Sequence, residues 1–151
     1  MHTSTLDFAD TTVIGARYLP GLQTDLTSWT LSIDDTGRLI QTLDTFAPVP
    51  KKARRAVIQI DQAFVLEWLA QADALDFTAL QTMEYSMSID DASTYTLMYH
   101  FASVKQSITL RTLGWFVRQE QPKMMAFRAL WDAIHAVAPF PQTRRPWTAL
   151  R

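Results

Sequence analysis

The chain has 151 residues and a net charge of −1 at neutral pH, and 48% of its residues are hydrophobic. This composition excludes wholesale disorder, and the charge balance does not favour a free-standing nucleic-acid binder. The absence of cysteine excludes disulfides, thiol nucleophiles and Cys-ligated metals. We interpret residues 1–151 as a single α+β domain with a Pro/Arg-containing tail at 139–151.

The first part of the chain alternates between apolar and polar residues, which is typical of strands with one buried face. We predict strands at Thr12–Tyr18, Trp29–Ile33, Arg38–Leu43 and Arg55–Ile60. The sequence Asp34-Asp35-Thr36-Gly37 favours a turn, so the second and third strands are expected to form a hairpin.

A helix is expected next, at about Asp61–Ala74, because Asp61 is a good N-cap and apolar residues recur at helical spacing. The apolar stripe of this helix comprises Phe64, Val65, Trp68, Leu69 and Ala72. Alternation then returns and predicts strands at Met83–Ile89, Tyr95–Phe101 and Val104–Leu110. A second helix is expected at about Pro122–Val137, with a stripe of Phe127, Leu130, Trp131, Ile134 and Val137.

These elements predict a two-layer sandwich of one mainly antiparallel sheet with both helices on one face, packed through Trp68 and Trp131. The stretches Trp29–Asp35 and Tyr85–Asp91 match in pattern, and each precedes a hairpin and then a helix. A duplicated strand-strand-strand-helix unit explains this match. Chance similarity between two amphipathic strands is the alternative.

The order of the elements resembles a family of small, uncharacterised bacterial α+β domains. The resemblance is carried by Trp29–Leu43, by Ile60–Phe77, and by Asp90–Leu97 with Gln106–Leu110 after it. Members of that family carry cysteines in the first loop, whereas this loop reads Leu19-Pro20-Gly21-Leu22-Gln23. The resemblance therefore implies a fold rather than an activity, and it implies no redox or metal role for the loop.

The sequence contains no motif for a metal, a cofactor or a phosphate-binding loop. The three histidines have no metal-ligand spacing, and no Gly-x-Ser-x-Gly nucleophile elbow is present. We therefore expect no metal, no cofactor and no catalytic residue. The alternative is an enzyme with a noncontiguous site near His100 and the paired acids Asp90 and Asp91. Asp favours turns, and adjacent strand residues point to opposite faces. We therefore interpret both Asp pairs, Asp34-Asp35 and Asp90-Asp91, as turn residues.

The sharpest charge feature is the basic cluster Lys51-Lys52-Ala53-Arg54-Arg55. Its candidate anion-binding residues are Lys51, Lys52, Arg54 and Arg55, which suit phosphates or an acidic protein. A solvated loop balanced by acids elsewhere is the alternative. Since the chain has no overall basic excess, we predict that any nucleic-acid contact here is weak and salt-dependent.

The polar side of the predicted sheet is the candidate binding surface. Its residues are mostly small and uncharged, and they comprise Thr30, Ser32, Gln59, Ser86, Ser88, Thr96, Met98, His100, Ser107 and Thr109. A face with few charges loses little solvation energy when another protein docks on it. The alternative is that Ser and Thr simply suit exposed strands. The last two predicted strands place one exposed patch around Met98 and His100, comprising Thr96, Met98, His100, Ser107 and Thr109.

The leading hypothesis is a non-catalytic binding module that recognises another protein through this patch. The enzyme and the anion-binding cluster remain the alternatives, and self-association into a homo-oligomer is left open. No apolar run reaches the length of a membrane span and the N-terminal residues do not resemble a signal peptide, so we expect a cytoplasmic protein without a membrane partner.

Overall fold

A computed structural model describes residues 8–19, 27–45, 54–77, 79–80, 94–111 and 122–139 of the chain. Its strands are β1 (Thr12–Leu19), β2 (Thr27–Asp34), β3 (Arg38–Thr45), β4 (Arg54–Gln59), β5 (Thr94–Phe101) and β6 (Val104–Arg111). Its helices are α1 (Gln62–Ala74) and α4 (Pro122–Ala136). The predicted strand at Met83–Ile89 and nearly all of the predicted tail lie outside the described residues.

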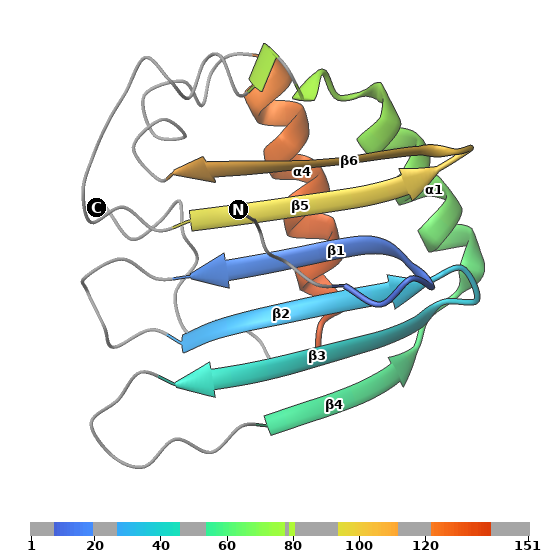
Figure 1. Ribbon diagram of the computed structural model, residues 1–151, viewed down its shortest axis with the longest axis vertical. Helices are drawn as coiled ribbons and strands as arrows, with labels where there is room; N and C mark the ends of the chain where they lie inside the picture. The colour runs from blue at the N-terminus through green and yellow to red at the C-terminus, as the bar shows by residue number, and fades with distance from the viewer. Residues whose placement is uncertain are drawn as a thin grey trace.

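The strands form one six-stranded sheet in the order β4-β3-β2-β1-β5-β6, and every neighbouring pair is antiparallel. The first four strands follow one another across the sheet, and β5 then pairs with the free side of β1. Figure 1 views the sheet from the face opposite α1 and α4, which we call the open face. The α+β class and the antiparallel sheet predicted from the sequence are confirmed.

The β2–β3 hairpin turns at the residues predicted from their turn chemistry. Oδ1 of Asp34 accepts hydrogen bonds from the Thr36 N–H at 2.9 Å, the Thr36 hydroxyl at 2.7 Å and the Arg38 N–H at 3.0 Å. Gly37 has a φ of +94°, which glycine adopts without the steric cost of a Cβ atom. The turn therefore fixes the register that sets which residues of β2 and β3 face the core.

The β5–β6 hairpin turns on two residues that are not glycine. Ala102 and Ser103 have φ angles of +52° and +70°. Positive φ at both positions is the type I′ turn that matches the twist of the flanking strands, and Asn or Gly adopts it at lower cost. This hairpin therefore holds local backbone strain next to the cross-strand pair His100 and Lys105.

Helix α1 begins where the sequence predicts, because the Asp61 side chain accepts a hydrogen bond of 2.9 Å from the Ala63 N–H. Its buried face comprises Val65, Trp68, Leu69 and Ala72. Phe64, predicted on the same stripe, is 47% exposed and stacks on the Trp68 ring with centroids 5.8 Å apart. Phe64 thus lies at the margin of the buried face rather than in the core.

Helix α4 begins at Pro122, a position where the missing N–H of proline costs nothing. Its buried face comprises Met124, Phe127, Leu130, Trp131 and Ile134, whereas Val137 lies past the helix end and is half-buried. Neither helix in the described part of the chain is long and apolar enough to cross a membrane.

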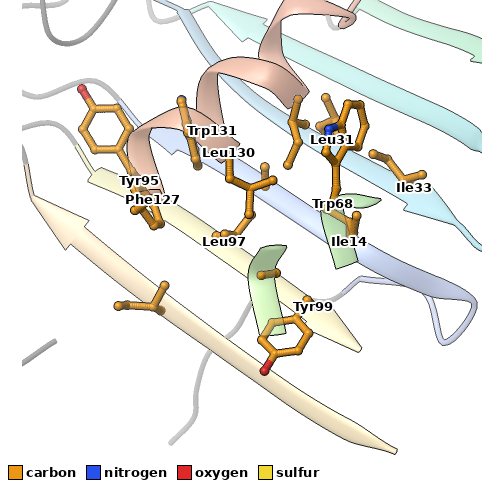
Figure 2. Close-up of a cluster of buried hydrophobic side chains, with 14 of the residues drawn as sticks. Ile14, Leu31, Ile33, Trp68, Tyr95, Leu97, Tyr99, Phe127, Leu130 and Trp131 are labelled. Carbon is orange, nitrogen blue, oxygen red and sulfur yellow. The ribbon is translucent and has the colours of Figure 1, made fainter. Parts of the chain in front are cut away.

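One buried cluster joins the sheet to both helices (Figure 2). Figure 2 shows strand residues such as Ile14, Leu31 and Leu97 in one cluster with helix residues such as Trp68, Leu130 and Trp131. Trp68 is 4% exposed and Trp131 is 2% exposed, so both residues predicted to pack the helices against the sheet lie in the core. Both helices lie on the same side of the sheet, and the open face lies on the other side (Figure 1).

Candidate docking face of the sheet

The open face is made by every second residue of each strand. In β1, Ile14, Ala16 and Tyr18 enter the core, so Gly15 and Arg17 lie on the open face. The register continues this face into the neighbouring strands, because residues that are directly paired point to the same side of the sheet.

The residues of the predicted patch do lie together on this face. Thr96 of β5 is paired with Thr109 of β6, and their hydroxyl oxygens are 3.0 Å apart. Met98 is paired with Ser107, and His100 follows at the end of β5. The side chains of His100, Ser107 and Thr109 are exposed.

The prediction that Met98 is the exposed centre of the patch is wrong. Met98 is 5% exposed and Thr96 is 8% exposed, so both are buried. The reason is that β5 is not an edge strand: it lies between β1 and β6, and Met98 faces Gly15 of β1. The ring of Phe8 stands over Gly15 and so covers this part of the open face.

The open face is also basic, and the sequence-based description of a charge-poor face is wrong. Its described strand cations are Arg17, Arg38, Arg55 and Lys105. Among the strand side chains described on this face, Asp34 is the only acid, and it is engaged in its own turn. Period-two alternation was sufficient to place Arg17 here, since it lies between the core residues Ala16 and Tyr18.

A row of arginine and threonine residues crosses the open face from edge to edge. From β4 to β6 it comprises Arg55, Thr42, Thr30, Arg17, Thr96 and Thr109. We call it the Arg/Thr row. Because neighbouring strands lie about 4.8 Å apart, the Cα atoms of Arg55 and Arg17 are separated by roughly 14 Å. Arg17 is half-buried at the middle of the row, whereas Arg55 is exposed on the edge strand.

The sheet divides the predicted basic cluster. Lys51 and Lys52 lie outside the described residues. Arg54 and Arg55 are consecutive residues of β4 and therefore leave the strand on opposite faces. Arg55 alone of these two contributes to the open face.

Of the residues of the alternative catalytic site, His100 alone lies in the described part of the chain. Asp90 and Asp91 lie outside it. His100 is exposed at the end of β5, and its cross-strand neighbour is Lys105 rather than an acid. No group of three His, Cys, Asp or Glu side chains that could hold a metal occurs among the described residues.

The first Asp pair has a structural role, as its turn chemistry predicts. Burial raises the pKa of the Asp34 carboxyl, but hydrogen bonds from the Thr36 hydroxyl and from the backbone N–H groups of Arg38 and Thr36 outweigh it. The positive charge of Arg38 acts in the same direction, so the pKa lies below the usual 3.8. Asp34 is therefore a carboxylate at neutral pH that stabilises its own turn.

An aromatic cluster that sequence patterns did not reveal lies between the sheet and α4. The ring of Trp131 lies 5.6 Å from that of Trp29 and 5.3 Å from that of Tyr95. His135, in the last turn of α4, stacks on Trp29 at 5.4 Å and is half-buried. The cluster is on the core side of the sheet, so it anchors α4 and contributes nothing to the open face.

Comparisons with known proteins assign no family to this chain. No model of a known protein family matches it, and no curated protein matches it significantly.

Proposed function

We propose that this chain is a non-catalytic binding module that recognises an acidic protein partner through the open face of its sheet. The observation that carries this proposal is the Arg/Thr row, in which Arg17 lies between Thr30 and Thr96. A guanidinium group binds a carboxylate through two parallel hydrogen bonds, and a neighbouring hydroxyl can donate another. An acidic side chain over Arg17 would thus meet donors from adjacent strands.

The distribution of charge over the described residues supports an acidic partner. The acids on or next to α1 and α4 are Asp61, Glu67, Asp73, Asp76 and Asp132. The cations on this side of the sheet are Lys123 and Arg128 of α4 and Arg54 of β4, which are fewer than the acids, and Arg128 is already paired with Asp132 at 3.9 Å. The helix side is therefore acidic while the open face is basic. Such a field steers an acidic partner to the open face and away from the helices.

Aromatic side chains favour a protein over a nucleic acid as the partner. Sheet faces that bind single-stranded nucleic acid stack the bases on aromatic rings. Among the residues that the structure describes, Phe8 is the only Phe, Tyr or Trp over the open face, and its ring is already packed against Gly15. We therefore propose that nucleic-acid contacts through Arg55 and its neighbours are weak.

We further propose that the chain is a single two-layer sandwich, built from a duplicated strand-strand-strand-helix unit and related to the bacterial family that it resembles. The two edge strands support the duplication, because β4 precedes α1 in the sequence and β6 precedes α4. Such an arrangement gives both helices to one face and leaves the other face to a partner. A bacterial cytoplasm is the proposed setting.

Charge reversal on the open face tests the proposed function. The variant Arg55→Glu/Lys105→Glu changes two exposed residues of the open face, which lie on the two edge strands of the sheet. Lys123→Glu is the matched control, because Lys123 is also exposed but belongs to α4. The probe is poly-L-glutamate, titrated into ¹⁵N-labelled protein. We expect chemical-shift changes at residues of the open face and weaker binding of poly-L-glutamate as the salt concentration rises. The double variant should bind poly-L-glutamate at least tenfold more weakly than the wild type does.

Three results would contradict the proposal. The first is that poly-L-glutamate binds the double variant as tightly as it binds the wild type. The second is that the chemical-shift changes caused by poly-L-glutamate map to α1 and α4. The third is that oligo(dT) binds the wild type more tightly than poly-L-glutamate does at the same salt concentration. Affinity capture from the native host, with the wild type and the double variant as parallel baits, then identifies the partner as a protein lost from the double variant alone.

A further inference from the structure

A glycine in the middle of the sheet provides a seat for an aromatic side chain. Gly15 belongs to β1, which has a strand on each side. A Cβ atom added at Gly15 would lie 2.5 Å from Cζ of Phe8 and 2.7 Å from both Cε atoms. The tip of the Phe8 ring therefore rests on the backbone of Gly15. A larger residue at this position would have to displace the ring.

The residues paired with Gly15 on the neighbouring strands lie on either side of this seat. Gly15 is paired with Ser32 of β2 on one side and with Met98 of β5 on the other. The same row continues from Ser32 to Ile40 and Val57, and Val57 is 42% exposed. A mostly apolar row thus runs beside the Arg/Thr row. The open face can therefore take an apolar group and an acidic group side by side.

The chain itself carries such a pair of groups next to the seat. In the sequence, Asp7 directly precedes Phe8, and Asp10 follows it two residues later. The Thr12 N–H donates a hydrogen bond of 2.9 Å to the Ala9 carbonyl, and this turn folds the chain back so that Phe8 lies over β1. Phe8 is half-buried and Asp10 is exposed. An aromatic residue with acidic neighbours in the chain thus covers part of a basic face.

We propose that the Gly15 seat is an aromatic-binding subsite of the open face, and that Phe8 fills it until a partner displaces it. The partner is an acidic protein segment with its own aromatic residue, whose ring takes the seat while a carboxylate reaches Arg17. Arg17 is two residues from Gly15, about 6.8 Å along β1, which is within the span of neighbouring residues in a peptide. This inference rests on the proposed function and adds the chemistry of the partner and a competition within the chain.

The competition has an expected magnitude. A tethered segment acts at an effective concentration on the order of 1 mM. If the Phe8 segment itself has an intrinsic Kd of about 100 μM for the seat, its occupation of the seat weakens the binding of a competing partner roughly tenfold. Removing the Phe8 ring restores this affinity without altering the Arg/Thr row.

A peptide with the sequence of residues 3–13 supplies the aromatic segment in trans. The full chain with Phe8→Ala has an empty seat, and its ¹⁵N spectrum reports whether it is folded. We expect the peptide to bind this variant about tenfold more tightly than it binds the wild type, with chemical-shift changes at the backbone amides of Gly15 and Met98. The same peptide carrying Phe8→Ala is the control and should not bind. Adding Gly15→Ala to the protein fills the seat and should abolish binding.

Each of the following outcomes would contradict the proposed aromatic-binding subsite. Equal binding of the two peptides would show that the ring is not recognised, and full binding by the Gly15→Ala protein would show that the seat is not used. An unfolded Phe8→Ala chain would show that Phe8 is a core residue rather than a displaceable one. If the Phe8→Ala chain binds poly-L-glutamate but not the peptide, the subsite fails and the proposed function stands. If it binds neither, both fail.

Discussion

The hydroxyl group of Tyr99 donates a hydrogen bond of 3.0 Å to Oδ1 of Asp73, which joins β5 to the C-terminal end of α1. The Tyr99 ring itself is buried and meets Phe77 edge-to-face at 5.3 Å. Burial raises the pKa of Tyr99 above 10.0, and the hydrogen bond and charge of Asp73 raise it further. The neutral phenol is thus the form that the folded protein favours.

Tyr99→Phe should lower the free energy of unfolding by about 0.5–1.5 kcal/mol, since one hydrogen bond to a carboxylate near the surface is lost. Because the folded-state pKa is raised, this contribution is complete below the unfolded value of about 10 and is lost as pH rises through the folded-state pKa. Urea unfolding of both proteins from pH 7 to 11 should therefore show the difference shrinking above pH 10. A difference that stays constant over this range would disprove the assignment.

Trp131→Ala should lower the free energy of unfolding by about 3–5 kcal/mol, because it leaves a cavity among Trp29, Tyr95 and Phe127. Met125→Ala on the same helix is the control: Met125 is 54% exposed, so its truncation should change stability by less than about 0.5 kcal/mol. Equal urea midpoints for the two variants would show that α4 does not pack through Trp131.

The helices and hairpins could be predicted because their signals are local. Asp61 caps α1, Pro122 opens α4, and the turn at Gly37 follows from residues that are adjacent in the sequence. Which residues of a strand face the helices also followed from alternation, as Tyr95 and Leu97 show. These features depend on a few neighbouring residues, so a single sequence is sufficient to place them.

The binding surface could be predicted only in part, because it depends on strand order. Alternation correctly sent Met98 away from the helices, but it could not show that β1 lies beside β5 or that Phe8 returns over Gly15. The Arg/Thr row likewise combines residues as distant in sequence as Arg17 and Thr96. A row across six strands has no local signature, so the neighbours of each residue in the row emerge only from the strand order and register.

Ser103→Gly should stabilise the protein by about 1 kcal/mol, since glycine removes the cost of a positive φ at the β5–β6 turn. Ala102→Asn should act in the same direction, as Asn-Gly is the preferred type I′ pair. The control is Ala126→Gly in the exposed interior of α4, which should instead destabilise by about 0.5–1 kcal/mol. Thermal unfolding of the three variants measures the signs, and a loss of stability in Ser103→Gly would refute the strain.

Asp34→Ala should remove part of the acid sensitivity of the fold. The folded-state pKa of Asp34 lies below 3.8, so its stabilising contribution is present above the unfolded value and is lost as pH falls through the folded one. The variant should therefore be less stable than the wild type at pH 7, and the difference should diminish below about pH 4. Urea unfolding as a function of pH checks this, and a difference independent of pH would exclude an ionic role.

Met98→Asp and His100→Glu should behave differently, although both residues lie on the open face of β5. Met98 is 5% exposed beneath the Phe8 segment, so a carboxylate there loses its water and should lower the free energy of unfolding by about 3 kcal/mol or more at pH 7. Because burial raises the pKa of a carboxyl group, the loss should become smaller at pH 4, where the new side chain is neutral. His100 is exposed at the strand end, so His100→Glu should change stability by less than about 0.5 kcal/mol at both pH values. Urea unfolding at the two pH values measures all four differences. If Met98→Asp proved as stable as His100→Glu, Phe8 would not cover this part of the face, and Met98 would return as a contact residue for the partner.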